Sequence, residues 1–181
     1  AERALARQAR AGDAEAFGLL IERHMRRPYV HALGIVGSRE DALDLSQEAF
    51  ARAYRARHTL DPDRPFYAWL YQILRRLSFN SLRDAKTRAR LETEQVDWLV
   101  CLSQSTATEP AREALRQEAR RPVAAAIERL PAREREVLVL KEFEEMKYRE
   151  IADLLDIPLG TVMSRLYSAR QRLATTLEYL R

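Results

Sequence analysis

The sequence predicts an all-α protein of two small helical domains joined by a flexible linker. Its 181 residues are enough for one ordinary domain or two small ones. Nearly every periodic segment has apolar residues at helical spacing, and no stretch alternates apolar and polar residues long enough to indicate a strand. Ser103–Pro110 separates two sets of such segments and is polar and proline-terminated, as linkers often are. With 46% hydrophobic residues, 32% charged residues and five glycines, a folded, helix-rich chain is expected.

The first helical segments are marked by capping residues and prolines. Asp13 is expected to cap a helix, and Pro28 falls where that helix should kink or break. Ser38, with Asp41 three residues on, resembles a capping box that opens a helix to about Arg57. The apolar residues of the first helix recur at helical spacing: Phe17, Leu20, Ile21 and Met25.

A long helix follows and completes the first predicted domain, residues 1–90. After the turn-rich stretch His58–Arg64, Pro65 suits the first position of this helix. A linker is predicted at residues 91–112 and a second domain at residues 113–181. The helical patterns after the linker cover approximately Ala111–Arg129, Ala132–Phe143, Lys147–Leu155 and Gly160–Tyr179.

Charge is unevenly distributed along the chain. The net charge of +4 and the pI near 9.4 permit a polyanionic partner but do not prove one. Residues 64–90 hold seven basic residues against one acid, whereas residues 142–156 hold six acids against two basic residues. The two signs are therefore separated along the sequence.

Several classes of function lack the residues that they need. The single cysteine, Cys101, cannot form an internal disulfide, and the three histidines have no cysteine at metal-ligand spacing. No glycine-rich phosphate loop and no paired nucleophile and base are present. We therefore expect no catalytic residue, metal, cofactor or small-molecule substrate, and the role of Cys101 stays open. Without a membrane-length apolar run or a signal peptide, the expected location is the cytoplasm.

The last helical segment has a polar face without acids. At about 100° per residue, its apolar stripe is Val162, Leu166, Ala169 and Leu173. Such a face can enter a major groove, where arginines and hydroxyls read base edges, and the short helix Tyr148–Leu155 completes a helix-turn-helix. The alternative is an ordinary solvated arginine face on a packing helix. The candidate DNA-binding residues are Thr161, Ser164, Arg165, Ser168 and Arg172.

The long helix after Pro65 carries a second face, on which aromatic and basic residues mix. Its expected core side is Phe66, Leu70, Ile73 and Leu77. Unstacked bases can lie on aromatic rings while arginines hold phosphates, so the adjoining side suits single-stranded nucleic acid. The alternative is that Trp69 and Phe79 are simply core and rim residues. The candidate residues on this side are Trp69, Gln72, Arg76, Phe79, Asn80 and Arg83.

An acidic face lies on the helix that Ser38 opens. Asp41, Asp44 and Glu48 are close together there, opposite an inward flank that we expect at Leu45, Ala49 and Phe50. Acids repel DNA but suit a basic or polar protein partner. A solvated acidic face remains an equal alternative.

Together these segments resemble the extracytoplasmic-function (ECF) group of the sigma-70 family. Residues 41–50 are similar to its core-polymerase-binding helix, which implies that Asp41, Asp44, Gln47 and Glu48 contact core RNA polymerase. Residues 66–73 and Asn80 resemble the helix that engages the minus-ten element, and the loop that ends at Arg64 is placed to capture a flipped base. Residues 130–166 are similar to the region that binds the minus-thirty-five element.

The resemblance implies a sigma factor that directs promoter-specific initiation. Its implied partners are core RNA polymerase, promoter DNA as duplex and as non-template single strand, and an anti-sigma factor. Met163, Ser168 and Arg76 depart from the residues that relatives often have, so a promoter sequence cannot be carried over. A helix-turn-helix regulator that is no polymerase subunit is the alternative, because Leu130–Leu138 also resembles the opening of response-regulator output domains. A helical adaptor that binds only protein would explain the acidic face but neither basic one.

Overall fold

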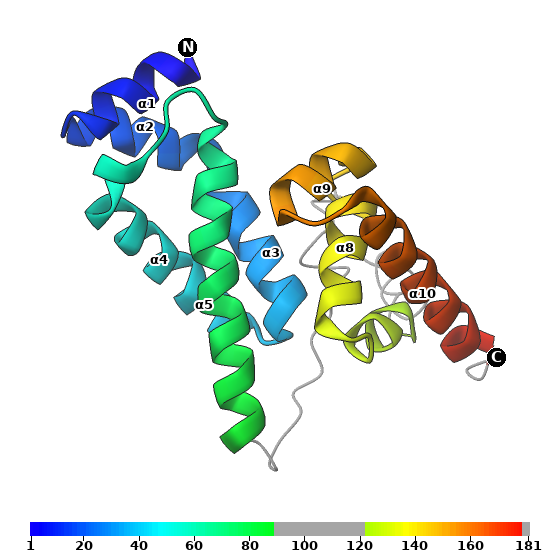
Figure 1. The fold of residues 1–181 in the computed structure, drawn as a ribbon. Coiled ribbons are helices and arrows are strands. Elements are labelled where there is room, and N and C mark those ends of the chain that lie inside the picture. The colour runs from blue at the N-terminus through cyan, green and yellow to red at the C-terminus, as the bar shows by residue number, and fades with distance from the viewer. Residues whose placement is uncertain (89–121, 179–181) are drawn as a thin grey trace, which may run out of the picture. The chain divides into compact units, whose positions relative to one another are not determined.

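The computed structural model describes residues 1–88 and 122–178. These residues form helices in two compact units, one within residues 1–90 and the other within residues 91–181 (Figure 1). No strand occurs in the described part of the chain. The all-α prediction is therefore confirmed. The predicted linker at 91–112, with Cys101, and the predicted helix before residue 122 lie outside the described residues.

Unit 1 confirms the predicted helix starts. The carboxylate of Asp13 accepts the backbone N–H groups of Glu15 and Ala16, and the Ser38 hydroxyl accepts that of Asp41. Both side chains thus satisfy donors that the first turn of a helix leaves unpaired. The long helix begins one residue after Pro65. The elements are α1 (Glu2–Arg10), α2 (Ala14–His24), α3 (Arg26–Val36), α4 (Arg39–Arg55), the short 3-10 helix η1 (Arg57–Thr59) and α5 (Phe66–Arg88).

Two helices of unit 1 were not predicted. Helix α1 contains mostly alanine and charged residues, so its apolar pattern is weak. Helix α3 contains Pro28, which we expected to mark a break. The break is real, because α2 ends at His24, but Pro28 is the third residue of the next helix. A proline is tolerated there because the first-turn N–H groups have no helical partner in any case.

The core side of α5 differs from the prediction. Phe66 and Leu70 are fully buried as expected, but Ile73 and Leu77 are only half-buried. The buried stripe of α5 instead includes Tyr67 and Tyr71, and it continues to Ser78. The buried residues of α5 are Phe66, Tyr67, Leu70, Tyr71, Leu74 and Ser78.

The tyrosines can be buried because α3 supplies a polar partner. The Tyr67 hydroxyl lies within hydrogen-bond distance of Nδ1 of His31, and the Tyr71 ring packs edge-on against the imidazole at 5.2 Å between centroids. Arg27 lies over the Tyr67 ring at 3.9 Å. Burial, and secondarily the nearby Arg27 charge, lowers the pKa of His31 from 6.5 to about 3. His31 is therefore neutral at physiological pH.

Helix α4 packs on α3 and α5 through small side chains. Its buried residues are Ala42, Ser46, Ala49 and Ala53. Of the residues expected on the inward flank, Ala49 is buried, whereas Leu45 and Phe50 are half-buried. The Ser46 hydroxyl donates to the Leu43 carbonyl oxygen at 2.8 Å, so this buried polar group is satisfied.

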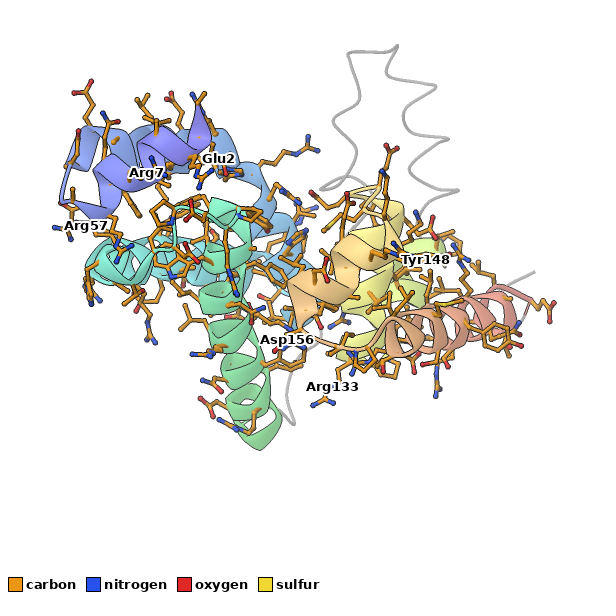
Figure 2. All side chains as sticks on the ribbon, turned by 45° about the horizontal axis from the view of Figure 1, so that its top comes forward. Glu2, Arg7, Arg57, Arg133, Tyr148 and Asp156 are labelled. Carbon is orange, nitrogen blue, oxygen red and sulfur yellow. The ribbon has the colours of Figure 1, made fainter. Side chains whose placement is uncertain are left out.

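Unit 2 contains the predicted helix-turn-helix. A helical stretch at 122–128 precedes α8 (Ala132–Glu142), α9 (Tyr148–Leu155) and α10 (Leu159–Glu178). The bounds of α8, α9 and α10 agree with the predicted ranges to within one or two residues. Asp156 ends α9 in the left-handed conformation with φ 54°, which lets the chain turn sharply into α10. Figure 2 labels Asp156 at this turn.

The core of unit 2 is aliphatic but contains a buried arginine. Val137, Leu140, Ile151 and Val162 are almost fully buried. Arg135 is 6% exposed and donates from Nη1 to the Glu128 carbonyl oxygen at 2.8 Å. Burial lowers the pKa of Arg135 to about 10, so the group remains charged near neutral pH. The guanidinium therefore ties α8 to the preceding helical stretch.

Candidate nucleic-acid interface

The mixed face on α5 is present in the structure. Arg76, Asn80 and Arg83 are exposed, whereas Trp69, Gln72 and Phe79 are half-buried. Arg83 donates to the Asn80 amide oxygen at 3.0 Å. The guanidinium of Arg75 lies over the Phe79 ring at 5.0 Å. Arg76 is exposed on this face and forms no ion pair with a described residue, so its positive charge is accessible.

Trp69 lies beside the segment that precedes α5. Its indole N–H donates to the Thr59 hydroxyl at 3.3 Å, and its ring is 5.8 Å from that of Phe66. Arg64 is highly exposed and only loosely paired, with Nε 3.7 Å from an Asp61 carboxylate oxygen. The aromatic ring and the loop cation predicted to contact DNA therefore lie at the same end of α5.

The face on α10 is only partly as predicted. Ser164 and Arg172 are exposed, but Thr161, Arg165 and Ser168 are half-buried. Arg172 is engaged by α8, with Nε 3.1 Å from a carboxylate oxygen of Glu134. The sequence analysis described this face as having no acid, but α8 brings one to it.

The most exposed part of α10 includes two residues that the sequence analysis did not select. Met163 is 52% exposed and Tyr167 is 67% exposed; they lie one turn apart on the same side of the helix, with Tyr167 nearer to Ser164. Met163 was noted only as a departure from the family pattern. A signal for both was available in the sequence, because both lie off the apolar stripe.

The acidic face on α4 is largely exposed. Asp41, Asp44 and Gln47 are exposed, and Glu48 is half-buried. Arg52 donates to Glu48 at 2.6 Å, and this hydrogen bond lowers the pKa of the carboxyl. Leu43 is 50% exposed on the same helix. A single exposed leucine is common on a solvated surface, so the choice between a protein partner and a solvated face rests on the acids.

Residues 1–88 and 122–178 contain neither a metal-binding cluster nor a membrane-spanning helix. No group of three histidines, cysteines, aspartates or glutamates there could hold a metal ion. No helix in those ranges is long and apolar enough to span a bilayer.

Two matches to known sequence families cover both faces. Residues 20–88 match Sigma-70 region 2, and residues 120–173 match Sigma-70, region 4. The first match contains α4 and α5, and the second contains the helix-turn-helix. The chain belongs to the sigma-70 family.

Full-length relatives of this sigma factor include ECF members. It is 32% identical to the ECF RNA polymerase sigma factor SigW of Bacillus subtilis, covering 96% of this chain and 95% of the relative. It is 33% identical to the ECF RNA polymerase sigma-E factor of Escherichia coli, covering 94% and 91%. A solved structure of CnrH in complex with the cytosolic domain of CnrY matches with a TM-score of 0.65 and 29% identity, over 98% of this chain and 97% of that chain.

Proposed function

We propose that this sigma factor directs RNA polymerase by binding energy alone, with each unit reading one promoter element. Residues 1–90 are assigned to core-polymerase binding and to the minus-ten element, residues 91–112 to a linker, and residues 113–181 to the minus-thirty-five element. The observation that carries the proposal is the mixed face of α5, with exposed arginines beside half-buried rings.

The α5 face is assigned to the opened non-template strand. Trp69 and Phe79 offer ring surface for unstacked bases, and Arg64, Arg76 and Arg83 offer charge for phosphates. Asn80 and Gln72 have amides that can bond base edges. Stacking on aromatic side chains contributes about 1–3 kcal/mol per base, which offsets the few kcal/mol that unstacking costs.

The α10 face is assigned to the duplex of the minus-thirty-five element. The assigned residues are Thr161, Ser164, Arg165, Ser168 and Arg172. Hydroxyls can bond base edges or phosphates in the major groove, and arginines can bond guanine. We add Tyr167 and Met163, because an exposed ring and thioether beside Ser164 can contact thymine methyl groups.

The acidic face of α4 is assigned to core RNA polymerase. Asp41, Asp44, Gln47 and Glu48 would contact a basic or polar surface, and Leu43 would add apolar area. A regulatory partner is also proposed. Because the CnrH relative was solved with CnrY, and a second solved sigma factor with an anti-sigma factor, we expect an anti-sigma factor for this chain. Such a complex is expected in the cytoplasm, where polymerase works.

Run-off transcription tests the proposal. Purified core polymerase is mixed with a pool of promoter fragments, with and without this protein. We expect protein-dependent transcripts whose templates share two spaced upstream elements. DNA binding by the protein without polymerase, together with no transcript, would contradict the proposal and favour a helix-turn-helix regulator.

Point variants assign the two elements. Asn80→Ala should relax the choice at one position of the minus-ten element, and Arg165→Ala should weaken recognition of the minus-thirty-five element. Each is measured as relative transcript yield across a set of promoter variants. If a variant transcribed every promoter in the same proportions as the wild type, that residue's assignment would be wrong.

A further inference from the structure

Helix α1 directs its arginines at the loop that leads into α5. Arg3 pairs through its guanidinium with the Asp63 carboxylate, and Nη2 of Arg7 lies 3.8 Å from the same oxygen of Asp63. Asp63 lies in the loop between η1 and α5, next to Arg64. Two cations from one helix thus converge on one loop carboxylate.

The first residue of α1 fastens the start of α5 itself. One carboxylate oxygen of Glu2 accepts the Phe66 N–H at 3.2 Å, and the other lies 3.3 Å from Nε2 of His24. The first N–H groups of a helix lack internal partners, and a negative charge near them is favourable. Glu2 therefore caps α5 from another helix. Figure 2 labels Glu2 and Arg7 on α1.

Helix α1 packs mainly on α2, and it reaches the loop and α5 through polar contacts. Its buried residues are Ala6 and Ala9, and Leu5 is only half-buried. Buried alanines remove little apolar surface from water. The polar contacts to Asp63 and Phe66 are therefore the main interactions that connect α1 to the loop and to α5. Those contacts end on the loop and on the first residue of α5.

We propose that α1 is a positioning element for promoter opening. Through Glu2, Arg3 and Arg7 it fixes loop 60–65 before DNA arrives. The inference rests on the proposed role of that loop in holding a base of the minus-ten element. A loop that is ordered beforehand loses less conformational entropy on binding, so the opened strand is held more tightly. The two arginines also offset the Asp63 charge that would otherwise repel DNA.

The test compares full-length variants in complex with core polymerase. Arg3→Ala/Arg7→Ala removes both cations, and Arg10→Ala is the matched control, since Arg10 is also an exposed arginine of α1. Opening is measured with a fluorescent base in the minus-ten element. Because exposed ion pairs contribute little, we expect opening to fall by about two- to fivefold, with the control unchanged. Affinity for core polymerase and unfolding in urea should match the control, and Arg3→Lys/Arg7→Lys should restore opening.

Two results would overturn the inference. One is opening by Arg3→Ala/Arg7→Ala equal to that of Arg10→Ala. The other is no rescue by the lysine variant. If even the wild type opened no promoter, the proposed function would fail first, and amide hydrogen exchange would then decide about α1 alone. Residues 58–66 should exchange faster in the double-alanine variant than in the control, and equal exchange would refute a positioning role.

Discussion

The two helices that carry the candidate DNA-binding residues differ in what surrounds their cations. On α5, Arg83 donates to an amide and Arg75 lies over a ring. On α10, Arg172 pairs with Glu134, and Arg170 donates to Glu142 at 2.6 Å. Arg76 of α5 is exposed and forms no ion pair with a described residue, so its charge is available for phosphates. The ion pairs on α10 hold Arg172 and Arg170 in place but offset their charge. This arrangement suits specific contacts with bases better than non-specific electrostatic attraction to DNA.

The two units also differ in the polar side chain that each buries. Unit 1 buries a neutral histidine between two tyrosines, whereas unit 2 buries a charged arginine among aliphatic side chains. Acid should therefore affect the first core through His31. The stability of unit 1 should therefore depend on pH through this buried imidazole.

Arg135→Ala should have the largest effect and should act on unit 2. It removes a buried hydrogen bond to Glu128 and leaves a cavity, so we expect unit 2 to lose about 3 kcal/mol of unfolding free energy. Hydrogen exchange of α8 and α9 peptides measures the loss. Arg133→Ala is the control, because Arg133 is exposed on the same helix and extends away from it (Figure 2). Equal exchange in both variants would show that the buried guanidinium is not needed.

Lowering the pH from 7 to 5 should destabilise unit 1. Below pH 6.5 the unfolded chain binds a proton at His31 that the folded chain excludes until about pH 3. Stability is therefore intact above pH 6.5 and falls as pH decreases, by about 2 kcal/mol at pH 5. Trp69 fluorescence in a Trp98→Phe background reports urea unfolding of this unit. His31→Phe should remove most of the difference between the two pH values, and an unchanged difference would assign it to other groups.

The candidate faces on α5 and α10 should contribute differently to the salt dependence of promoter binding. Arg76→Ala on α5 should reduce the salt dependence of promoter binding by about one unit of log–log slope, because Arg76 is exposed. Arg172→Ala on α10 should change that slope by less, because Glu134 already offsets its charge. The measurement is fluorescence anisotropy of the polymerase complex over a KCl series. Equal changes in slope for the α5 and α10 variants would contradict the proposed difference in charge between the two faces.

Glu134→Gln should have the smallest effect and the opposite sign. Freeing Arg172 from its ion pair with the half-buried Glu134 carboxylate should strengthen binding to the minus-thirty-five duplex several-fold at low salt, where charges are least screened. Asp153→Asn removes an exposed acid of α9 and serves as the control. A gain shared by both variants would reflect net charge rather than release of Arg172.

Local signals in the sequence were enough for most of the helices. Asp13, Ser38 and the turn before α10 predicted their helix boundaries because capping and turn chemistry act within a few residues. Helix α1 was missed because alanine and charged residues give no apolar pattern. The core side of α5 was misassigned because tyrosine burial depends on His31, which lies 36 residues away in sequence. Likewise, no local pattern could reveal that Glu134 would reach Arg172.

The Glu2 contact also bears on the order in which unit 1 folds. Glu2 and Phe66 are 64 residues apart in sequence, so this contact cannot form until most of the unit has been synthesised. At ribosomal speeds that interval is roughly 3 to 13 seconds. During this time α1 can pack on α2 and α3 on α4, whereas the contacts of α1 with loop 60–65 and with α5 still have to form. These contacts are therefore expected to form late, which would make loop 60–65 one of the last parts of the unit to take its shape on the ribosome.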